Sequence, residues 1–66
     1  MPIGTNIAAL RAASDLTQEA LARKAKITRV YLNRVENGKQ EPRQAIRGRL
    51  AKALGVKEET LWREEK

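Results

Sequence analysis

The sequence contains neither cysteine nor histidine. The lack of cysteine excludes disulfide bonds and thiolate metal sites, and both absences together remove the usual general bases, nucleophiles and soft metal ligands. The four glutamates near the C-terminus are interpreted as a solvated acidic tail rather than a carboxylate site. We therefore expect no enzyme, no metal site and no cofactor, and a cysteine-free chain is compatible with a reducing cytoplasm.

Long apolar runs are also missing. No run approaches the roughly 18 residues that span a bilayer, and the N-terminus lacks the basic-then-apolar layout of a signal peptide. The chain has 66 residues, no phenylalanine and ten alanines, which favour closely packed helices. We expect one cytoplasmic domain over residues 1–66 with one small core and no membrane contact.

Positive charge is concentrated in the middle of the chain. The net charge is +6, but the segment from Arg23 to Lys52 holds ten basic and two acidic residues, a net charge of +8. A solvated surface that only keeps the protein soluble is the plain alternative. Concentration of positive charge in one segment favours a polyanionic partner instead. No segment that would bind a small-molecule effector is evident.

Large apolar residues recur every three or four positions, which predicts an all-α fold. Five helices are expected, over about residues 5–13, 18–24 and 28–37, over a segment opened by Pro42 and ended by Gly55, and over a short C-terminal segment. Gly38 supplies the positive φ that commonly follows a helix end. No strand pattern or repeat is present.

The stretch "LARKAKITRVYLNRVENG" reads as one helix interrupted in its middle by Thr28, a residue that prefers to start helices. Two short helices joined by a tight turn form a helix-turn-helix, here over about residues 17–37. Ala22 lies where the helices cross, and Ile27 packs the turn into the core. Since the second helix turns two apolar residues inward, its opposite face is free to enter a DNA major groove.

The motifs "LTQEALA", "VENG" and "AKALGV" carry a family resemblance. With them, nearly the whole chain resembles the phage repressor and Cro family of helix-turn-helix transcription factors, the Xre-like regulators. This resemblance implies a compact five-helix bundle whose second and third helices bind DNA. It also implies that Arg11 on the first helix pairs with Glu36 at the end of the third.

Three departures from the family pattern are visible. Asp15 and Lys26 stand where the family usually has glycine, and a non-glycine residue in the left-handed conformation costs about 1–2 kcal/mol. Early in the fourth helix the chain has Gln44, Arg47 and Gly48 where the family usually has large apolar residues. This third departure bears on the packing of that helix and on any dimer contact through it.

The resemblance also assigns site residues. Arg29, Val30 and Arg34 match positions from which the family reads base edges, since arginine donates two bonds to guanine and valine packs on a thymine methyl. Asn33 points the same way and is a candidate for pairing with adenine. The expected contacts to the DNA backbone are Gln18, Thr28, Tyr31, Asn37, Lys39 and Arg43, with the Tyr31 ring half-buried.

The function expected is a sequence-specific double-stranded DNA-binding regulator, a bacterial or phage repressor that binds a near-palindromic operator as a homodimer. Leu61 and Trp62 are the candidates for the dimer contact, and the alternatives for Trp62 are packing on the first helix or capping the core. The rival function is a protein-interaction module of the same fold, such as an antitoxin that docks a toxin. Such a module more often exposes an apolar patch.

Overall fold

The computed structural model describes residues 3–62, and these residues are all helical or in short connections. The elements are α1 (Ile3–Ala13), α2 (Gln18–Ala25), α3 (Arg29–Glu36), α4 (Gln44–Leu54) and the 3₁₀ helix η1 (Glu58–Trp62). The all-α prediction is confirmed, with a 3₁₀ helix in place of the fifth α-helix. None of the helices within residues 3–62 has the length and apolar character to cross a bilayer.

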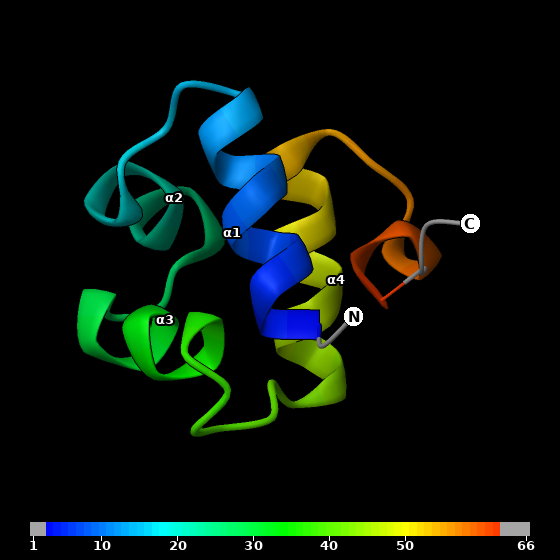
Figure 1. Ribbon diagram of the computed structural model, residues 1–66. Coiled ribbons are helices and arrows are strands. Elements are labelled where there is room, and N and C mark those ends of the chain that lie inside the picture. The colour runs from blue at the N-terminus through cyan, green and yellow to red at the C-terminus, as the bar shows by residue number, and fades with distance from the viewer. Residues whose placement is uncertain (1–2, 63–66) are drawn as a thin grey trace.

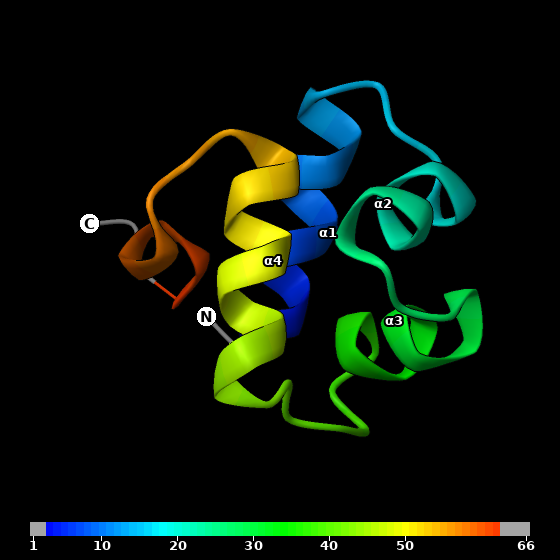
Figure 2. The same cartoon turned by 180° about the vertical axis from the view of Figure 1, so that it is seen from behind.

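One core joins all five elements. α2 packs against α3 and α4, α1 against α3, and η1 against α1 and α4. Figures 1 and 2 show α2 and α3 together on one side of the molecule and η1 on the opposite side. Each element contributes at least one large, fully buried side chain to the core, and the five largest are Ile7, Leu21, Leu32, Leu50 and Leu61. Removal of these side chains from water is the main driving force that holds the short helices together.

Threonine caps start both central helices. The Oγ1 atom of Thr17 accepts a hydrogen bond from the N–H of Ala20, and that of Thr28 accepts one from Tyr31, both at 3.0 Å. Each hydroxyl thereby satisfies a backbone N–H that has no partner within the helix. The interruption at Thr28 is therefore a helix start, as its residue type predicts.

Residues with a left-handed backbone conformation lie just after the C-terminal ends of α1, α2, α3 and α4. Asp15 and Lys26 have φ angles of 58° and 60°, and Gly38 and Gly55 both have 73°. Lys26 caps the C-terminus of α2, where its N–H donates to the Arg23 carbonyl at 3.2 Å. A side chain at such a φ costs about 1–2 kcal/mol. The tight turn that aims α3 thus contains a strained lysine.

Helix boundaries differ from the prediction at two starts. α1 begins at Ile3 rather than near residue 5, and α4 begins at Gln44 rather than at Pro42. Arg43 is extended, with a ψ of 156°, and caps α4. The Pro42 side chain is fully buried instead of opening the helix. Burial of the proline ring against the core, followed by an extended residue, moves the helix start two positions on.

Leu61 is a correction to the predicted dimer contact. Its side chain is fully buried in the core of this chain, so it is not available to a second copy. The reason is that η1 folds back onto α1: the Asn6 amide Nδ2 donates to the carbonyls of Thr60 and Leu61, each at 2.6 Å. The side chain of Trp62, the other candidate, lies outside what the structure describes.

Gly4 and Gly48 form a matched pair for testing the packing of α1. A Cβ atom on Gly4 would overlap the backbone carbonyl of Val35 in α3, whereas one on Gly48 would meet only the Glu58 Oε1 atom at 3.8 Å. We expect Gly4→Ala to lower the free energy of unfolding by about 3 kcal/mol, because backbone must move. Gly48→Ala should raise it by about 0.5–1 kcal/mol, since alanine favours a helix interior. Urea denaturation measures both, and a shift of the same sign in the two variants would contradict this packing.

Candidate nucleic-acid interface

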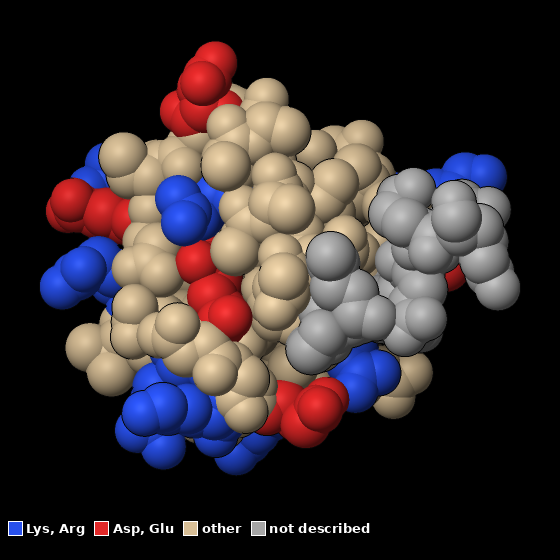
Figure 3. Space-filling view, in the orientation of Figure 1, with Lys and Arg blue, Asp and Glu red and all other residues tan. Residues whose placement is uncertain are grey.

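The outer face of α3 presents the four residues expected to read bases. Leu32 and Val35 are buried beneath the helix. Arg29, Val30, Asn33 and Arg34 are all exposed, and 66% of Val30 is accessible to solvent. In Figure 3, Lys and Arg side chains gather over α3 and the loop that follows it. This face is therefore basic, with one apolar side chain in its middle.

Three cations near this face have no partner among the residues that the structure describes. The side chains of Arg29, Arg34 and Lys39 are exposed and form no hydrogen bond or ion pair within residues 3–62. Arg11, in contrast, is held by an acidic residue. Cations that the fold leaves unneutralised are available to an anionic ligand at no cost in broken ion pairs.

Arg11 and Glu36 form the ion pair implied by the resemblance. Arg11 Nε donates to Glu36 Oε2 at 2.8 Å and Nη2 donates to Oε1 at 3.2 Å. The third nitrogen, Nη1, donates to the Leu16 carbonyl at 2.8 Å. The Glu36 side chain is only 5% exposed and that of Arg11 21%. This two-point pair ties α1 to the end of α3 and to the connection before α2.

A chain of side-chain amides, which was not predicted from the sequence, continues from Glu36 to the outer face. Gln18 Nε2 donates to Glu36 Oε1 at 2.9 Å, and Gln18 Oε1 accepts from Asn33 Nδ2 at 3.3 Å. Asn33 Oδ1 in turn accepts from Asn37 Nδ2 at 3.1 Å. Only the four-residue spacing of Asn33 and Asn37 on one helix signals this chain in the sequence. Pairing of Asn33 with adenine would use the same two amide atoms.

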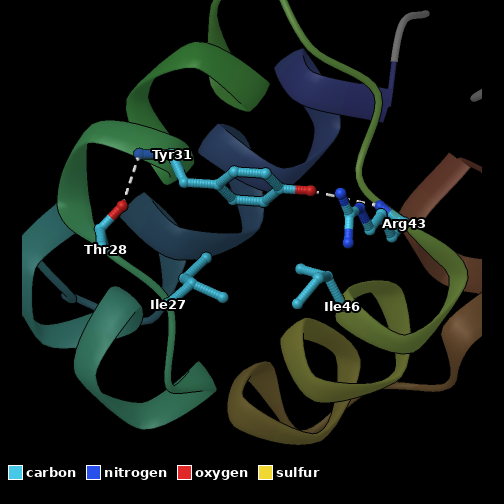
Figure 4. Close-up of a pocket in the computed structure, with 5 residues that line it drawn as sticks. All are labelled: Ile27, Thr28, Tyr31, Arg43 and Ile46. Atoms are coloured by element: carbon cyan, nitrogen blue, oxygen red, sulfur yellow. Dashed lines mark hydrogen bonds between the residues drawn. The ribbon is translucent and has the colours of Figure 1, made fainter.

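Tyr31 connects α3 to the start of α4 (Figure 4). Its hydroxyl accepts a hydrogen bond from the backbone N–H of Arg43 at 3.3 Å, above a cleft lined by Ile27, Thr28 and Ile46. The ring is partly buried, as predicted. Because the hydroxyl accepts this bond, its own hydrogen stays free to donate to a ligand oxygen. Tyr31 therefore holds Arg43 near α3 and keeps a donor beside it.

The fold thus brings most of the predicted site together. The exposed face of α3 carries the candidates for base contact, and its C-terminal end leads into the loop with Lys39 and Arg43. Gln18 joins this face through the amide chain from α2. The dimer candidates are separate from it, because η1 lies on the other side of the molecule (Figure 1).

Sequence comparison identifies relatives along almost the whole chain. A helix-turn-helix family model matches residues 7–61. An immunity repressor of Bacillus phage phi105 is 38% identical over 71 residues, which cover 98% of this chain and 49% of the repressor. A helix-turn-helix transcriptional regulator of Sinorhizobium fredii is 37% identical, over 82% of this chain and 70% of the regulator. Another, of Methanocaldococcus jannaschii, is 38% identical, over 79% of each chain. The chain spans about half the length of the phage repressor.

Structure comparison agrees with these relatives. The crystal structure of the restriction-modification controller protein C.AhdI from Aeromonas hydrophila superimposes with a TM-score of 0.90 and 31% identity, over 92% of each chain. The fold and the relatives together define the class: the chain belongs to the helix-turn-helix family of phage-repressor-like, Xre-type regulators. This is a family of DNA-binding transcription regulators.

The Glu36 carboxylate provides a test of how firmly α3 is held. Glu36→Gln would turn an amide N–H toward the donors of Arg11 and Gln18, so we expect the free energy of unfolding to fall by about 2–3 kcal/mol. Glu41→Gln is the matched control, because Glu41 is 82% exposed and lies 3.8 Å from Arg47. The control should change the free energy by less than about 0.5 kcal/mol. Equal losses in guanidinium denaturation would show that Glu36 has no special role.

Proposed function

We propose that the protein is a sequence-specific transcriptional repressor that binds a near-palindromic operator in double-stranded DNA as a homodimer, with α3 in the major groove. The observation that carries this proposal is the exposed face of α3, where Arg29 and Arg34 flank Val30 and have no partner within the described residues. A major groove about 12 Å wide admits an α-helix. The similarity to a phage immunity repressor supports repression rather than activation.

The proposed roles are supported by the residue type of each side chain and by its exposure on or near α3. Arg29 and Arg34 donate to guanine edges and Val30 contacts a thymine methyl. Asn33 serves as an adenine contact or, through the amide chain, as the support of Gln18. The proposed backbone contacts place donors at both ends of α3: Gln18, Thr28, Tyr31, Asn37, Lys39 and Arg43.

A protein-docking function finds less support. Among the described residues Val30 is the exposed large apolar side chain, and it lies between the two arginines of α3. A docking surface for a protein usually has an apolar centre of several side chains. The charge and exposure of this face therefore favour DNA over an antitoxin-like role.

Arg34 and Lys39 should respond differently to truncation. Arg34→Ala should cost about 1–3 kcal/mol on the preferred sequence and relax selectivity at one base pair per half-site. Lys39→Ala should weaken binding to all duplexes alike and lower the slope of log K against log salt by about one per subunit. Titrations on specific and scrambled duplexes over a range of salt separate these outcomes. If Arg34→Ala weakens both duplexes equally, α3 does not read sequence through Arg34.

The stoichiometry on DNA tests the dimer. A single copy contacts few base pairs, so two copies on half-sites about 34–36 Å apart are expected. With Leu61 in the core, Trp62 stays the candidate contact. Analytical ultracentrifugation of the protein with a duplex that carries the selected site should show two chains per duplex, and footprinting should show two-fold symmetric protection. One chain per duplex at saturation would reject the homodimer and leave the proposal of base reading intact.

A further inference from the structure

A second basic surface lies away from the outer face of α3. A groove of about 460 Å³ is lined by Lys24, Lys26, Arg49 and Lys52, with Ala25 and Ala53 as its apolar part. We call it the α2–α4 groove. It is far larger than the roughly 30 Å³ that one water occupies. Its lining contains no acidic side chain, so four positive charges share one hollow without a counter-charge there.

The groove lies at the other ends of the helices that build the proposed DNA surface. That surface uses Gln18 at the start of α2 and Arg43 at the start of α4, whereas the groove uses the C-terminal parts of both helices. At 1.5 Å per residue, these ends are separated by about 10 Å along α2 and about 13 Å along α4. Figure 2 shows α2 and α4 from the side opposite to Figure 1. The groove and the proposed DNA surface therefore use opposite ends of α2 and of α4.

Lys26 gives a second, independent observation. Its backbone is left-handed, with a φ of 60°, a conformation that glycine adopts at no steric cost. Arg49 Nη1 donates to the Lys26 carbonyl at 3.3 Å and so holds this turn against α4. The fold thus keeps a lysine where its side chain is conformationally costly, and that side chain lines the groove. Strain retained at one residue points to a role beyond packing.

Cations at helix C-termini also stabilise the helix dipole, which is the plain reason for a basic residue at such an end. Here the ends of two helices meet, and Arg49 lies in the interior of α4, two turns or less from its end. The dipole accounts for charge at each separate end. It does not account for a shared hollow that only small apolar and cationic side chains line.

We propose that the α2–α4 groove binds the phosphodiester backbone of a second DNA duplex, so that one protein molecule bridges two DNA segments. The lining favours nucleic acid over an acidic polypeptide, because its apolar part consists of two alanines and a protein interface normally has a larger apolar core. Contacts to phosphate need only cations and are independent of sequence. The second duplex is therefore bound without base reading. This proposal goes beyond the repressor function and does not require Arg34.

A capture experiment tests the bridge. The full-length protein is bound to an immobilised duplex with the preferred site, and a fluorescent scrambled duplex is then added in solution. The groove variant is Lys24→Gln with Lys52→Gln. The matched control is Arg23→Gln with Lys57→Gln, which removes the same charge from exposed residues outside the groove, one of them also on α2. A third variant, Lys24→Arg with Lys52→Arg, keeps the charge with a different side-chain shape.

The groove variant should lose capture of the second duplex by about tenfold or more at 0.1 M salt, with the slope of log K against log salt lower by about two. The control and the double arginine variant should retain capture. All variants should hold the immobilised duplex selectively and unfold at temperatures close to that of the wild type. Because Arg34→Ala should lose selectivity but keep the second contact, failure of the two proposals can be told apart.

Three outcomes would overturn the bridge. Equal capture by the wild type and the groove variant would place the second duplex elsewhere, for example on the second α3 of a dimer. Equal loss in the groove and control variants would show an effect of net charge alone. Binding of poly-glutamate in the groove without capture of a second duplex would assign the groove to an acidic polypeptide.

Discussion

The Glu36 carboxylate is the point at which three helices meet through polar contacts. Arg11 from α1 donates two bonds to it and Gln18 from α2 donates a third, while Glu36 itself ends α3. Because the side chain is almost fully buried, its charge requires these donors. The direction of α3 relative to the other two helices is therefore set by one ion pair and one amide rather than by apolar packing alone.

The fold separates charges that hold the structure from charges that stay free. Arg11 and Arg47 are engaged with carboxylates or backbone carbonyls, and their side chains are partly buried. Arg29, Arg34 and Lys39 are exposed and unpaired within residues 3–62. Concentrated positive charge repels itself, which lowers the stability of a small domain, but it also speeds and strengthens association with a polyanion. Five short elements around five large core residues have to offset that repulsion.

Local signals in the sequence were reliable where a single residue decides the backbone. Threonine at both caps, glycine at φ of 73° and the interruption at Thr28 all have a local cause. The left-handed Lys26 and the Arg11–Glu36 pair came from the family resemblance. The start of α4 was mispredicted because burial of Pro42 depends on tertiary packing. Leu61 was mispredicted for the same reason, because the sequence does not distinguish an apolar residue that packs in the core from one that contacts a second copy.

The amide chain escaped prediction because its members come from different helices. Gln18 and Asn33 are 15 residues apart and each looks like a solvated polar residue by itself. Only the orientation of α2 against α3 brings their amides together, and that orientation depends on Glu36. The same limit applies to the α2–α4 groove, where the cations of α2 and its cap lie more than twenty residues before those of α4 in the sequence. Local propensity cannot report such contacts.

Selection of bound duplexes from a random pool, carried out with the unmodified protein, tests most directly whether α3 reads the edges of base pairs. If it does, we expect enrichment of a short, near-palindromic sequence whose two halves are one helical turn apart and contain guanine where arginine makes contact. A bound pool without any enriched sequence, at salt concentrations where binding persists, would contradict it, because affinity would then come from the phosphate backbone alone.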